Sequence, residues 1–260
     1  MNAAIAKRDI RRSFGAAAAG YDSVAALQRR VGAELLARFD VSPAAGAIAD
    51  LGCGTGFLTG LLLGRAADRP VYALDIALPM LQAARVKWPA GVRYVCADAE
   101  RLPLADAGLG QIYSNLALQW CADLPALFGD CRRVLAPGGQ LAFATFGPGT
   151  LVELKAAWAE VDDYRHVNAF VSGAEIRDQL AVAGWHDGDI VSRTYSTEYA
   201  AVADLMRELK GIGAHNLNAD RRHGPTTRRQ LRDMVAAYQA LMPDARILAS
   251  WEILFVRAFR

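Results

Sequence analysis

Short apolar runs alternate with helical patterns between about residue 47 and residue 145. Repeated units of one strand and one helix predict a parallel sheet with helices on both faces. Because such crossovers are right-handed, we expect the sheet to be doubly wound. The predicted strands are Ala47–Leu51, Val71–Asp75, Val92–Ala97, Gln111–Ser114 and Gln140–Phe146, and the predicted helices are Phe57–Arg65, Pro79–Lys87 and Leu124–Leu135.

The chain on either side of these units has a different pattern. Val24–Phe39 has apolar residues at helical spacing, which predicts a helix outside the sheet. Pro137-Gly138-Gly139 predicts a turn before the last of the five strands. Beyond Phe146 the pattern predicts the helices Leu151–Val161, Ala174–Ala183, Ala201–Leu209 and Arg229–Met242, and the strands Asp189–Tyr195 and Trp251–Phe259.

These elements predict one domain over residues 1–260, with a helical cap over 1–45 and a lid insertion at about 198–228. The last predicted helix, Arg229–Met242, is amphipathic. Its apolar face is expected to contain Leu231, Met234, Val235, Tyr238 and Leu241.

Composition excludes several classes of protein. The 260 residues are 53% hydrophobic, which argues against disorder, and the formal charge of 29 − 27 = +2 is too small for nucleic-acid binding across the whole surface. Neither the four cysteines nor the four histidines have the spacing of a metal site, so no metal is expected. No apolar run approaches the roughly 18 residues of a membrane span. Unpaired cysteines fit a reducing compartment, and we expect a cytoplasmic protein.

The loop Asp50-Leu51-Gly52-Cys53-Gly54-Thr55-Gly56 joins a predicted strand to a predicted helix. Gly52, Gly54 and Gly56 let the backbone turn tightly and approach a ligand closely. A nicotinamide dinucleotide is the competing ligand, but its loop is G-x-G-x-x-G and Asp50 would be a poor neighbour for its pyrophosphate. A carboxylate at this position suits a cationic ligand. S-adenosylmethionine, which carries both an ammonium and a sulfonium, is therefore favoured as the cofactor.

Two further acids end the next two predicted strands. Asp75 is placed to accept hydrogen bonds from ribose hydroxyls, and Asp98 to accept one from the adenine amino group. The alternative is that each Asp caps the following helix, but acids at three successive strand ends make coincidence a weak explanation. The remaining predicted cofactor contacts are Ile76, Met80, Ala99, Asn115 and Leu116.

The motifs also resemble those of the class I methyltransferase family. The matching segments, in order, are Asp50–Gly56, Leu74-Asp75-Ile76, Cys96–Ala99 and Arg133–Gly139. The resemblance implies a Rossmann-like, seven-stranded sheet whose last strand, here Trp251–Phe259, is antiparallel. The Asn-Pro-Pro-Tyr motif of amino-group methylases is absent after the predicted fourth strand. An oxygen or carbon acceptor is therefore favoured over the amino group of adenine or the amide of glutamine.

A narrower resemblance concerns the malonyl-acyl-carrier-protein O-methyltransferases of biotin synthesis. It rests on Phe14–Asp22 with Gln28, and on Asn115–Trp120, Thr145–Leu154 and Lys210–Asn216. The resemblance implies that a malonyl carboxylate on an acyl carrier protein receives the methyl group. A carboxylate with a pKa near 4 needs no general base, so the lack of an evident catalytic dyad agrees with this chemistry.

Candidate acceptor-side residues follow from this resemblance. Tyr21 is expected at the reacting centre, with Asn115 and Gln119 orienting the acceptor or the donor. Lys210 and His215 are candidates for binding the acceptor carboxylate. Three of them have a structural alternative: an aromatic packing residue for Tyr21, a helix cap for Gln119 and a solvated charge for Lys210.

Positive charge is concentrated in one stretch near the predicted lid. This stretch contains His223 and five arginines: Arg221, Arg222, Arg228, Arg229 and Arg232. Because acyl carrier proteins are acidic, this stretch is expected to steer the carrier, the alternative being a solvated helix face. Two other functions stay open from sequence: a small-molecule O- or C-methyltransferase acting on another carboxylic acid or a quinone precursor, and a nucleotide-binding protein without catalysis. The oligomeric state is not predicted.

Overall fold

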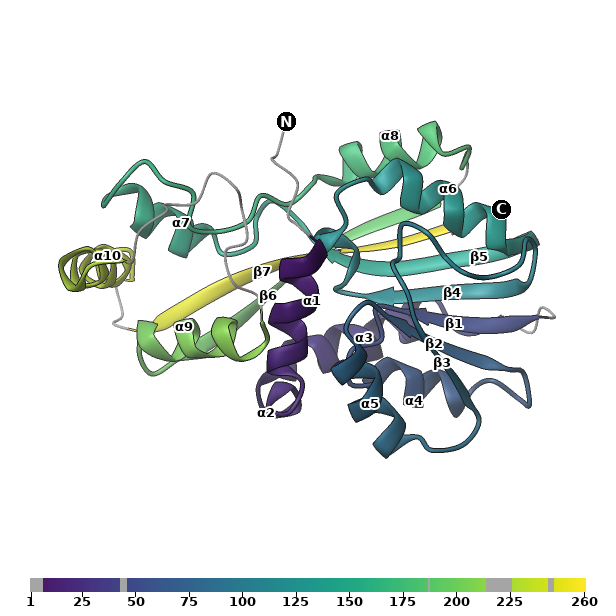
Figure 1. Ribbon diagram of the computed structural model, residues 1–260. Helices are drawn as coiled ribbons and strands as arrows, with labels where there is room; N and C mark the ends of the chain where they lie inside the picture. The colour runs from purple at the N-terminus through teal and green to yellow at the C-terminus, as the bar shows by residue number, and fades with distance from the viewer. Residues whose placement is uncertain (1–6, 43–45, 187, 214–225, 243–245) are drawn as a thin grey trace.

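A computed structural model describes residues 7–42, 46–186, 188–213, 226–242 and 246–260. Its centre is a seven-stranded sheet in the order β3-β2-β1-β4-β5-β7-β6 (Figure 1). The first five strands are parallel, and β7 runs antiparallel to both β5 and β6. The strands are β1 Ala47–Leu51, β2 Val71–Asp75, β3 Val92–Cys96, β4 Leu109–Asn115, β5 Leu135–Phe146, β6 Gly188–Tyr199 and β7 Ile247–Phe259.

Helices cover both faces of this sheet, as the sequence predicts. Successive residues of a strand point to opposite faces, so β1 contributes Ile48 to one apolar core and Ala49 to the other. This double burial explains why β1 is apolar along its whole length up to Asp50. One face carries α3 Ala26–Arg38, α4 Phe57–Leu63 and α5 Leu78–Lys87, and the other carries α6 Leu124–Val134 and α8 Gly173–Val182 (Figure 1).

Within residues 1–45, where the sequence predicts a helical cap, the structure has a helix whose bounds the sequence pattern did not give. This helix, α1 Lys7–Ala17, is followed by the single turn α2 Tyr21–Val24 and then by α3, which matches the predicted helix. Ile10, Phe14 and Ala17 lie on one face of α1 at helical spacing, but this apolar stripe is short and only Ile10 is buried, so it is a weak signal in the sequence. In Figure 1, α1 lies across the carboxyl ends of the central strands.

Two predictions about the sheet need correction. Pro137-Gly138-Gly139 forms a bulge inside β5 instead of a turn before it, because the register shifts from Leu109↔Leu135 to Gln111↔Gln140. The N–H of Gly138 donates to the carbonyl of Arg260 at 3.0 Å, which holds the bulge against the end of β7. Strands β6 and β7 are also longer than predicted, since they pair continuously from Gly188↔Ala258 to Tyr199↔Ile247.

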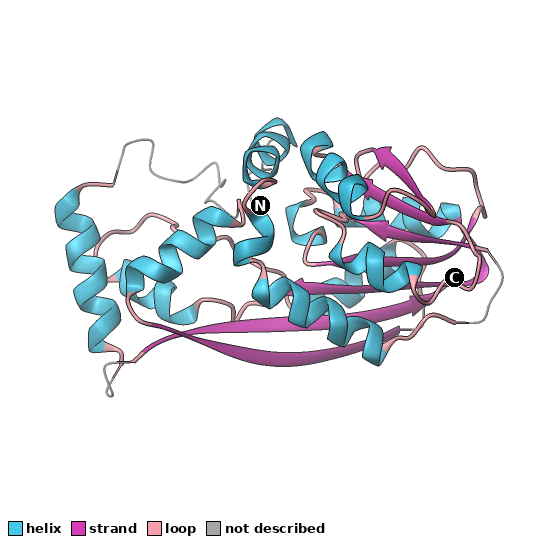
Figure 2. Ribbon diagram, turned by 90° about the horizontal axis from the view of Figure 1, so that it is seen from below, coloured by secondary structure: helices cyan, strands magenta, loops and turns pink. Residues whose placement is uncertain are grey.

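The far end of the long β6–β7 hairpin carries three more helices, α7 Val152–Ala159, α9 Val202–Gly211 and α10 Arg228–Ala240 (Figures 1 and 2). Met234 and Tyr238 of α10 are buried against this end. Leu231 and Leu241 are 44% and 47% exposed, so the buried face of α10 is narrower than predicted. None of the helices in the described ranges is long and apolar enough to cross a membrane.

Candidate functional site

A pocket lies at the carboxyl ends of the parallel strands, where the strand order reverses between β1 and β4. This is where open α/β sheets bind their ligands. The helix α1 and the 3-10 turn η1 Leu118–Trp120 close its other sides. Its lining residues include Gly52, Gly54, Asp75, Ile76, Met80, Asp98, Ala99, Asn115, Leu116 and Tyr21, all predicted from sequence.

The three glycines of the loop have different structural roles. Gly52 has a φ of +72°, and a Cβ there would lie 2.2 Å from the Cβ of Ala117. Gly54 has a φ of +52° and nothing within 4 Å of its Cβ position, so it leaves open space in the pocket wall. Gly56 does not line the pocket; a Cβ there would lie 2.9 Å from the Cβ of Ala84. Gly56 therefore serves the packing of α4 against α5.

One end of the pocket concentrates buried acceptor atoms. Asp50 is 1% exposed, and its Oδ2 accepts a 2.6 Å hydrogen bond from Thr59 Oγ1. Within the described part of the chain, Asp50 Oδ1, Gln28 Oε1 and Asn115 Oδ1 are buried without a hydrogen-bond donor. All three residues line the same recess. Unpaired buried acceptors are costly, so this recess fits a cationic donor such as an ammonium group.

Burial raises the pKa of Asp50 to about 7, with the nearby Asp75 acting in the same direction and the Thr59 hydrogen bond opposing both. A ligand cation would reverse this effect, because an opposite charge at close range favours the carboxylate. The recess therefore combines the shape and the charge that an α-amino group requires.

Asp75 lies where the second strand ends, as predicted for a ribose contact. Its Oδ2 accepts from the N–H of Gly54 at 2.9 Å and its Oδ1 from the N–H of Ala77 at 2.8 Å. These two bonds fix the carboxylate, and each oxygen retains a second lone pair for a ligand hydroxyl. Burial raises the pKa of Asp75, and the backbone hydrogen bonds oppose that rise.

Tyr21 lines both the pocket and the acceptor-rich recess. Burial raises the pKa of its phenol far above the ordinary value, and the negative charges of Asp75 and Asp22 add to the effect. The phenol therefore stays protonated at neutral pH and can donate a hydrogen bond into the pocket. The structure places Tyr21 beside the site, while its contribution to catalysis stays a prediction.

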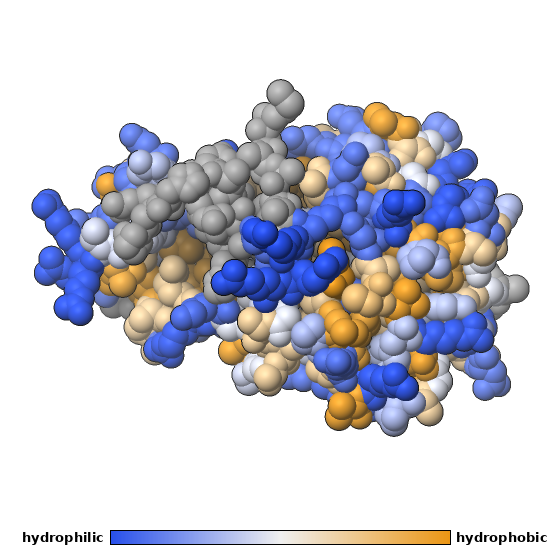
Figure 3. Space-filling model, in the orientation of Figure 1, coloured by the Kyte–Doolittle hydropathy of each residue, from blue (hydrophilic) through white to orange (hydrophobic). Residues whose placement is uncertain are grey.

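The opposite end of the pocket is closed by an ion-pair clasp that the sequence did not reveal. Lys7 Nζ of α1 lies 2.5 Å from Asp98 Oδ2 and 2.5 Å from Glu100 Oε2. Asp98, predicted to contact adenine, thus lines the pocket and also anchors α1. Phe14 adds an edge-to-face contact with Trp120 at 5.3 Å between ring centroids. Hydrophilic side chains cover the outward face of α1 (Figure 3).

We expect Lys7→Met to speed the release of a bound nucleotide from this pocket. The clasp is partly exposed, and exposed ion pairs contribute up to about 1 kcal/mol, so the dissociation rate should rise by up to about fivefold. Stopped-flow fluorescence of Trp120, which lines the pocket, measures this rate. Arg8→Met is the matched control, because the side chain of Arg8 is 90% exposed. Equal dissociation rates in the two variants would show that the clasp does not retain the ligand.

The acceptor-side candidates are not all brought to this pocket. Gln119 lies outside its lining; Gln119 Nε2 donates to the carbonyl of Leu116 at 2.7 Å, and Thr145 Oγ1 donates to Gln119 Oε1 at 3.3 Å. Lys210 is exposed in the last turn of α9. His215, Arg221 and Arg222 lie outside the described residues.

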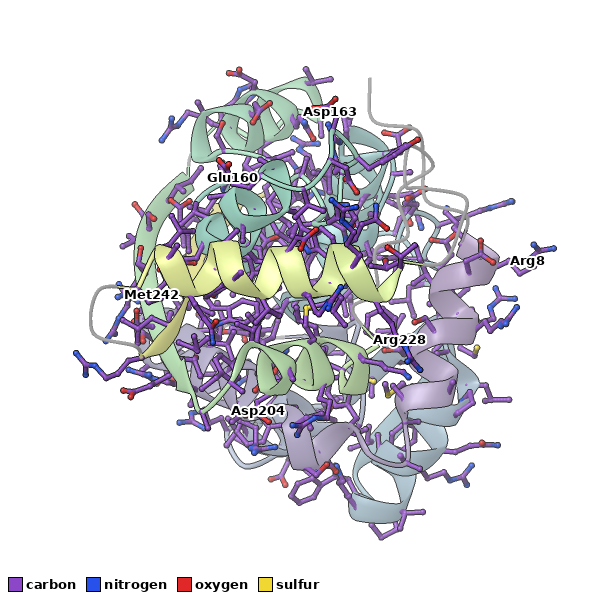
Figure 4. The ribbon with its side chains drawn as sticks, turned by 90° about the vertical axis from the view of Figure 1, so that its left-hand side faces the viewer. Arg8, Glu160, Asp163, Asp204, Arg228 and Met242 are labelled. Atoms are coloured by element: carbon purple, nitrogen blue, oxygen red, sulfur yellow. The ribbon has the colours of Figure 1, made fainter. Side chains whose placement is uncertain are left out.

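The remaining arginines lie away from the pocket lining, on α10. Figure 4 shows α10 with Arg228 in its first turn and Met242 just beyond its last. Arg228, Arg229 and Arg232 are exposed, and Arg229 forms a loose ion pair with Asp233 at 3.6 Å. Among the described residues no group of three or more His, Cys, Asp or Glu side chains could hold a metal ion.

Comparison with solved structures shows a methyltransferase-type fold. The YcgJ protein of Bacillus subtilis superposes with a TM-score of 0.63 at 14% identity, covering 89% of this chain and 98% of that one. A putative methyltransferase of Bacillus halodurans gives a TM-score of 0.61 at 17% identity, covering 88% and 97%. Residues 49–143 match the family model described as a methyltransferase domain.

Relatives with higher identity extend over nearly the whole chain. The malonyl-(acyl-carrier protein) O-methyltransferase of Methylococcus capsulatus is 44% identical, covering 95% of this chain and 92% of that protein. The enzyme of the same name from Halorhodospira halophila is 40% identical, covering 98% and 88%. The biotin biosynthesis bifunctional protein BioHC of Cellvibrio japonicus is 43% identical, although this chain spans only 50% of it. The chain therefore belongs to the malonyl-(acyl-carrier protein) O-methyltransferase family.

Proposed function

We propose that this protein transfers a methyl group from S-adenosylmethionine to the free carboxylate of a malonyl group carried by acyl carrier protein. The product is the methyl ester that enters the early, pimeloyl steps of biotin synthesis. The observation that carries this proposal is 44% identity to a malonyl-(acyl-carrier protein) O-methyltransferase over 95% of the chain. The carrier protein is thus the partner, and the carboxylate the acceptor.

The donor pocket supports the same reaction. S-adenosylmethionine supplies an electrophilic methyl group on a sulfonium sulfur. We assign its ammonium to the recess of Asp50, Gln28 and Asn115, where three buried oxygens lack donors within the described residues. Asp75 then binds the ribose hydroxyls and Asp98 the adenine amino group, and the apolar side chains that flank them are Ile76, Met80, Ala99 and Leu116.

The reaction requires alignment more than proton transfer. A carboxylate oxygen attacks the methyl carbon as the carbon–sulfur bond breaks, and the bond's electron pair goes to the sulfur. The attacking group is already ionised at neutral pH, so no residue has to accept a proton. Tyr21 keeps its phenolic proton and orients a substrate oxygen by donating to it. Gln119, in η1, has a positioning role. Its hydrogen bonds to Leu116 and Thr145 hold the backbone next to Asn115.

Labelled S-adenosylmethionine incubated with malonyl-carrier protein, a small malonyl thioester or aconitate tests the acceptor. We expect methyl ester on the two malonyl substrates and none on aconitate, with no loss of rate in EDTA. With S-adenosylmethionine saturating, kcat should show no titration of a catalytic base near neutral pH, and Tyr21→Phe should lower kcat by about threefold to tenfold without changing that profile. Methylation of aconitate alone, or a rate restored by metal after chelation, would contradict the proposal.

A further inference from the structure

A second hollow lies beyond the end of β5, outside the donor pocket. Its volume is about 560 Å³; it is open to solvent and lies between α7 and the residues that follow it. Figure 4 shows this region above α10, where Glu160 and Asp163 are labelled. The residues of the hollow used below are Pro148, Lys155, Trp158, His166, Asn168 and Phe170.

The floor of the hollow is held in a fixed position. The N–H of Gly149 donates to Glu252 Oε2 at 2.7 Å, and the N–H of Gly147 donates to the Glu252 carbonyl at 2.8 Å. A Cβ at Gly147 would lie 2.6 Å from Glu252 Oε2, so a side chain there would displace the carboxylate that holds Gly149. The turn presents the carbonyl of Pro148, which accepts a 2.9 Å hydrogen bond from Lys155 Nζ.

The walls of the hollow are aromatic and equally well supported. The rings of Trp158 and His166 stack with centroids 3.7 Å apart and planes within 7°. His166 Nε2 lies 2.7 Å from Asp162 Oδ1, and Asp162 Oδ2 accepts a 3.1 Å hydrogen bond from Gln230 of α10. Such a supported wall favours a ligand site over an irregular gap between loops.

Two polar atoms in this aromatic setting point to the chemistry of the ligand. Asn168 Oδ1 is buried and has no donor within the described residues, so it would accept from an N–H group. Lys155 Nζ lies 5.6 Å from the centre of the Phe170 ring and would donate to a carbonyl oxygen. A flexible chain with amide groups between apolar segments fits this hollow. Its amides would hydrogen-bond to the two polar atoms, and its apolar segments would pack against the aromatic rings.

The hollow and the donor pocket are related through β5. Phe170 packs on Phe146, the last residue of β5, at 5.2 Å between ring centroids. Two residues earlier on the same strand, Ala144 pairs with Asn115, which lines the donor pocket. Two strand residues span about 7 Å, so the hollow and the donor pocket lie near the same end of β5.

We propose that this hollow binds the amide-bearing pantetheine arm that joins the malonyl group to its carrier. An amide N–H of the arm donates to Asn168 Oδ1, and an amide carbonyl accepts from Lys155 Nζ. The inference rests on the proposed function, because that function makes a carrier-bound thioester the substrate.

The test compares Asn168→Leu and Lys155→Met with Arg177→Met, an exposed-charge control on α8. Substrates are malonyl-pantetheine and malonyl methyl thioester, which lacks amides. Each hollow variant should raise the KM for malonyl-pantetheine by about threefold to tenfold, the effect of one lost hydrogen bond. The kinetics with malonyl methyl thioester and the Kd for S-adenosylmethionine should stay within about twofold of the control. Neither ligand is expected to contact the mutated side chains, and distant sites act nearly independently.

Calorimetric titration with pantetheine gives a second readout that does not depend on turnover. Wild type and Arg177→Met should bind pantetheine, and both hollow variants should bind it several-fold more weakly. Unchanged KM and pantetheine binding in both hollow variants, or equal losses with both thioesters, would overturn the pantetheine site and leave the proposed function intact. Failure of the wild-type protein to methylate any malonyl thioester would overturn the proposed function, and this inference with it.

Discussion

Replacing Asp50 by Asn should abolish tight binding of S-adenosylmethionine. Asn has nearly the same shape and can still accept the hydrogen bond from Thr59, but it carries no charge to pair with the ammonium group. Breaking a buried ion pair costs about 3–5 kcal/mol, so the Kd should rise at least about a hundredfold. Calorimetric titration at about pH 7.5, above the raised pKa of Asp50, measures this change. Asp106→Asn, at an exposed carboxylate paired with Arg133, is the control and should bind normally.

The same substitution should stabilise the ligand-free protein above neutral pH. The pKa of Asp50 is raised to about 7 in the folded state, from an ordinary value of 3.8. The protonated carboxyl therefore favours folding at low pH, and that contribution is lost as pH rises from about 4 through about 7. The amide in Asp50→Asn does not titrate. The free energy of unfolding of the variant should therefore increase relative to that of wild type between about pH 6 and about pH 8. Urea unfolding at both pH values tests this, and a constant difference would show that Asp50 is already ionised without ligand.

The affinity of the wild-type protein for S-adenosylmethionine should depend on pH in the corresponding way. Because the ammonium requires an ionised Asp50, the Kd should fall as pH rises from about 6 to about 7.5, and binding at the lower pH should release protons to the buffer. Asp50→Asn should lose this dependence. Together, the affinity and the stability readouts separate a ligand-binding carboxylate from one that merely supports the loop.

The sheet was predictable because its strands are buried on both faces. Such strands are continuous apolar runs. Because the strands are parallel, acids at their carboxyl ends lie at the same edge of the sheet, independently of the conformation of the connecting loops. Asp75 and Asp98 accordingly line the pocket and Asp50 its recess, while their contacts with the donor stay predictions. The antiparallel β7 was expected from the family resemblance, and the structure confirms it.

The helix α1 could not be predicted by the same logic. It buries Ile10 and otherwise depends on tertiary contacts, such as that of Phe14 with Trp120. The clasp of Lys7 with Asp98 joins residues 91 positions apart, and no local pattern reports such a pair. A lysine at the start of a short, weakly apolar helix gives the same sequence pattern whether the helix covers a pocket or lies on an exposed surface.

Side-chain direction limited the remaining assignments. Gln119 and Asn115 are close in sequence, but Gln119 is bonded to the carbonyl of Leu116 while Asn115 lines the pocket. Gln28, whose Oε1 is buried without a donor in the described residues, entered the sequence analysis only as part of a family motif. Its position beside Asn115 follows from the packing of α3 against the pocket, where Asn115 Nδ2 donates to the Gln28 carbonyl at 2.8 Å.

Reversing the charge of the α10 arginines should selectively impair the reaction with malonyl-carrier protein. Arg228, Arg229 and Arg232 lie exposed in the first five residues of the helix, and hydrophilic side chains cover this end of the molecule (Figure 3). Three positive charges there oppose the positive end of the helix macrodipole, which favours acids in the first turn. The macrodipole therefore gives these arginines no stabilising role at this end of the helix. We expect them to attract an acidic partner, the alternative being a solvated helix face.

The triple variant Arg228→Glu, Arg229→Glu and Arg232→Glu should raise the apparent KM for malonyl-carrier protein at least about tenfold at low salt, because electrostatic steering raises association rates by about 10- to 1000-fold. Since Glu suits a helix N-terminus, its Tm should equal or exceed that of wild type. Donor affinity and turnover of a small malonyl thioester should not change. At about 0.5 M salt the Debye length falls to a few ångströms, so the difference between variant and wild type should largely disappear. Wild-type carrier kinetics at low salt would show that these arginines form only a solvated face, whereas a lowered Tm with both substrates impaired would assign them to the stability of α10.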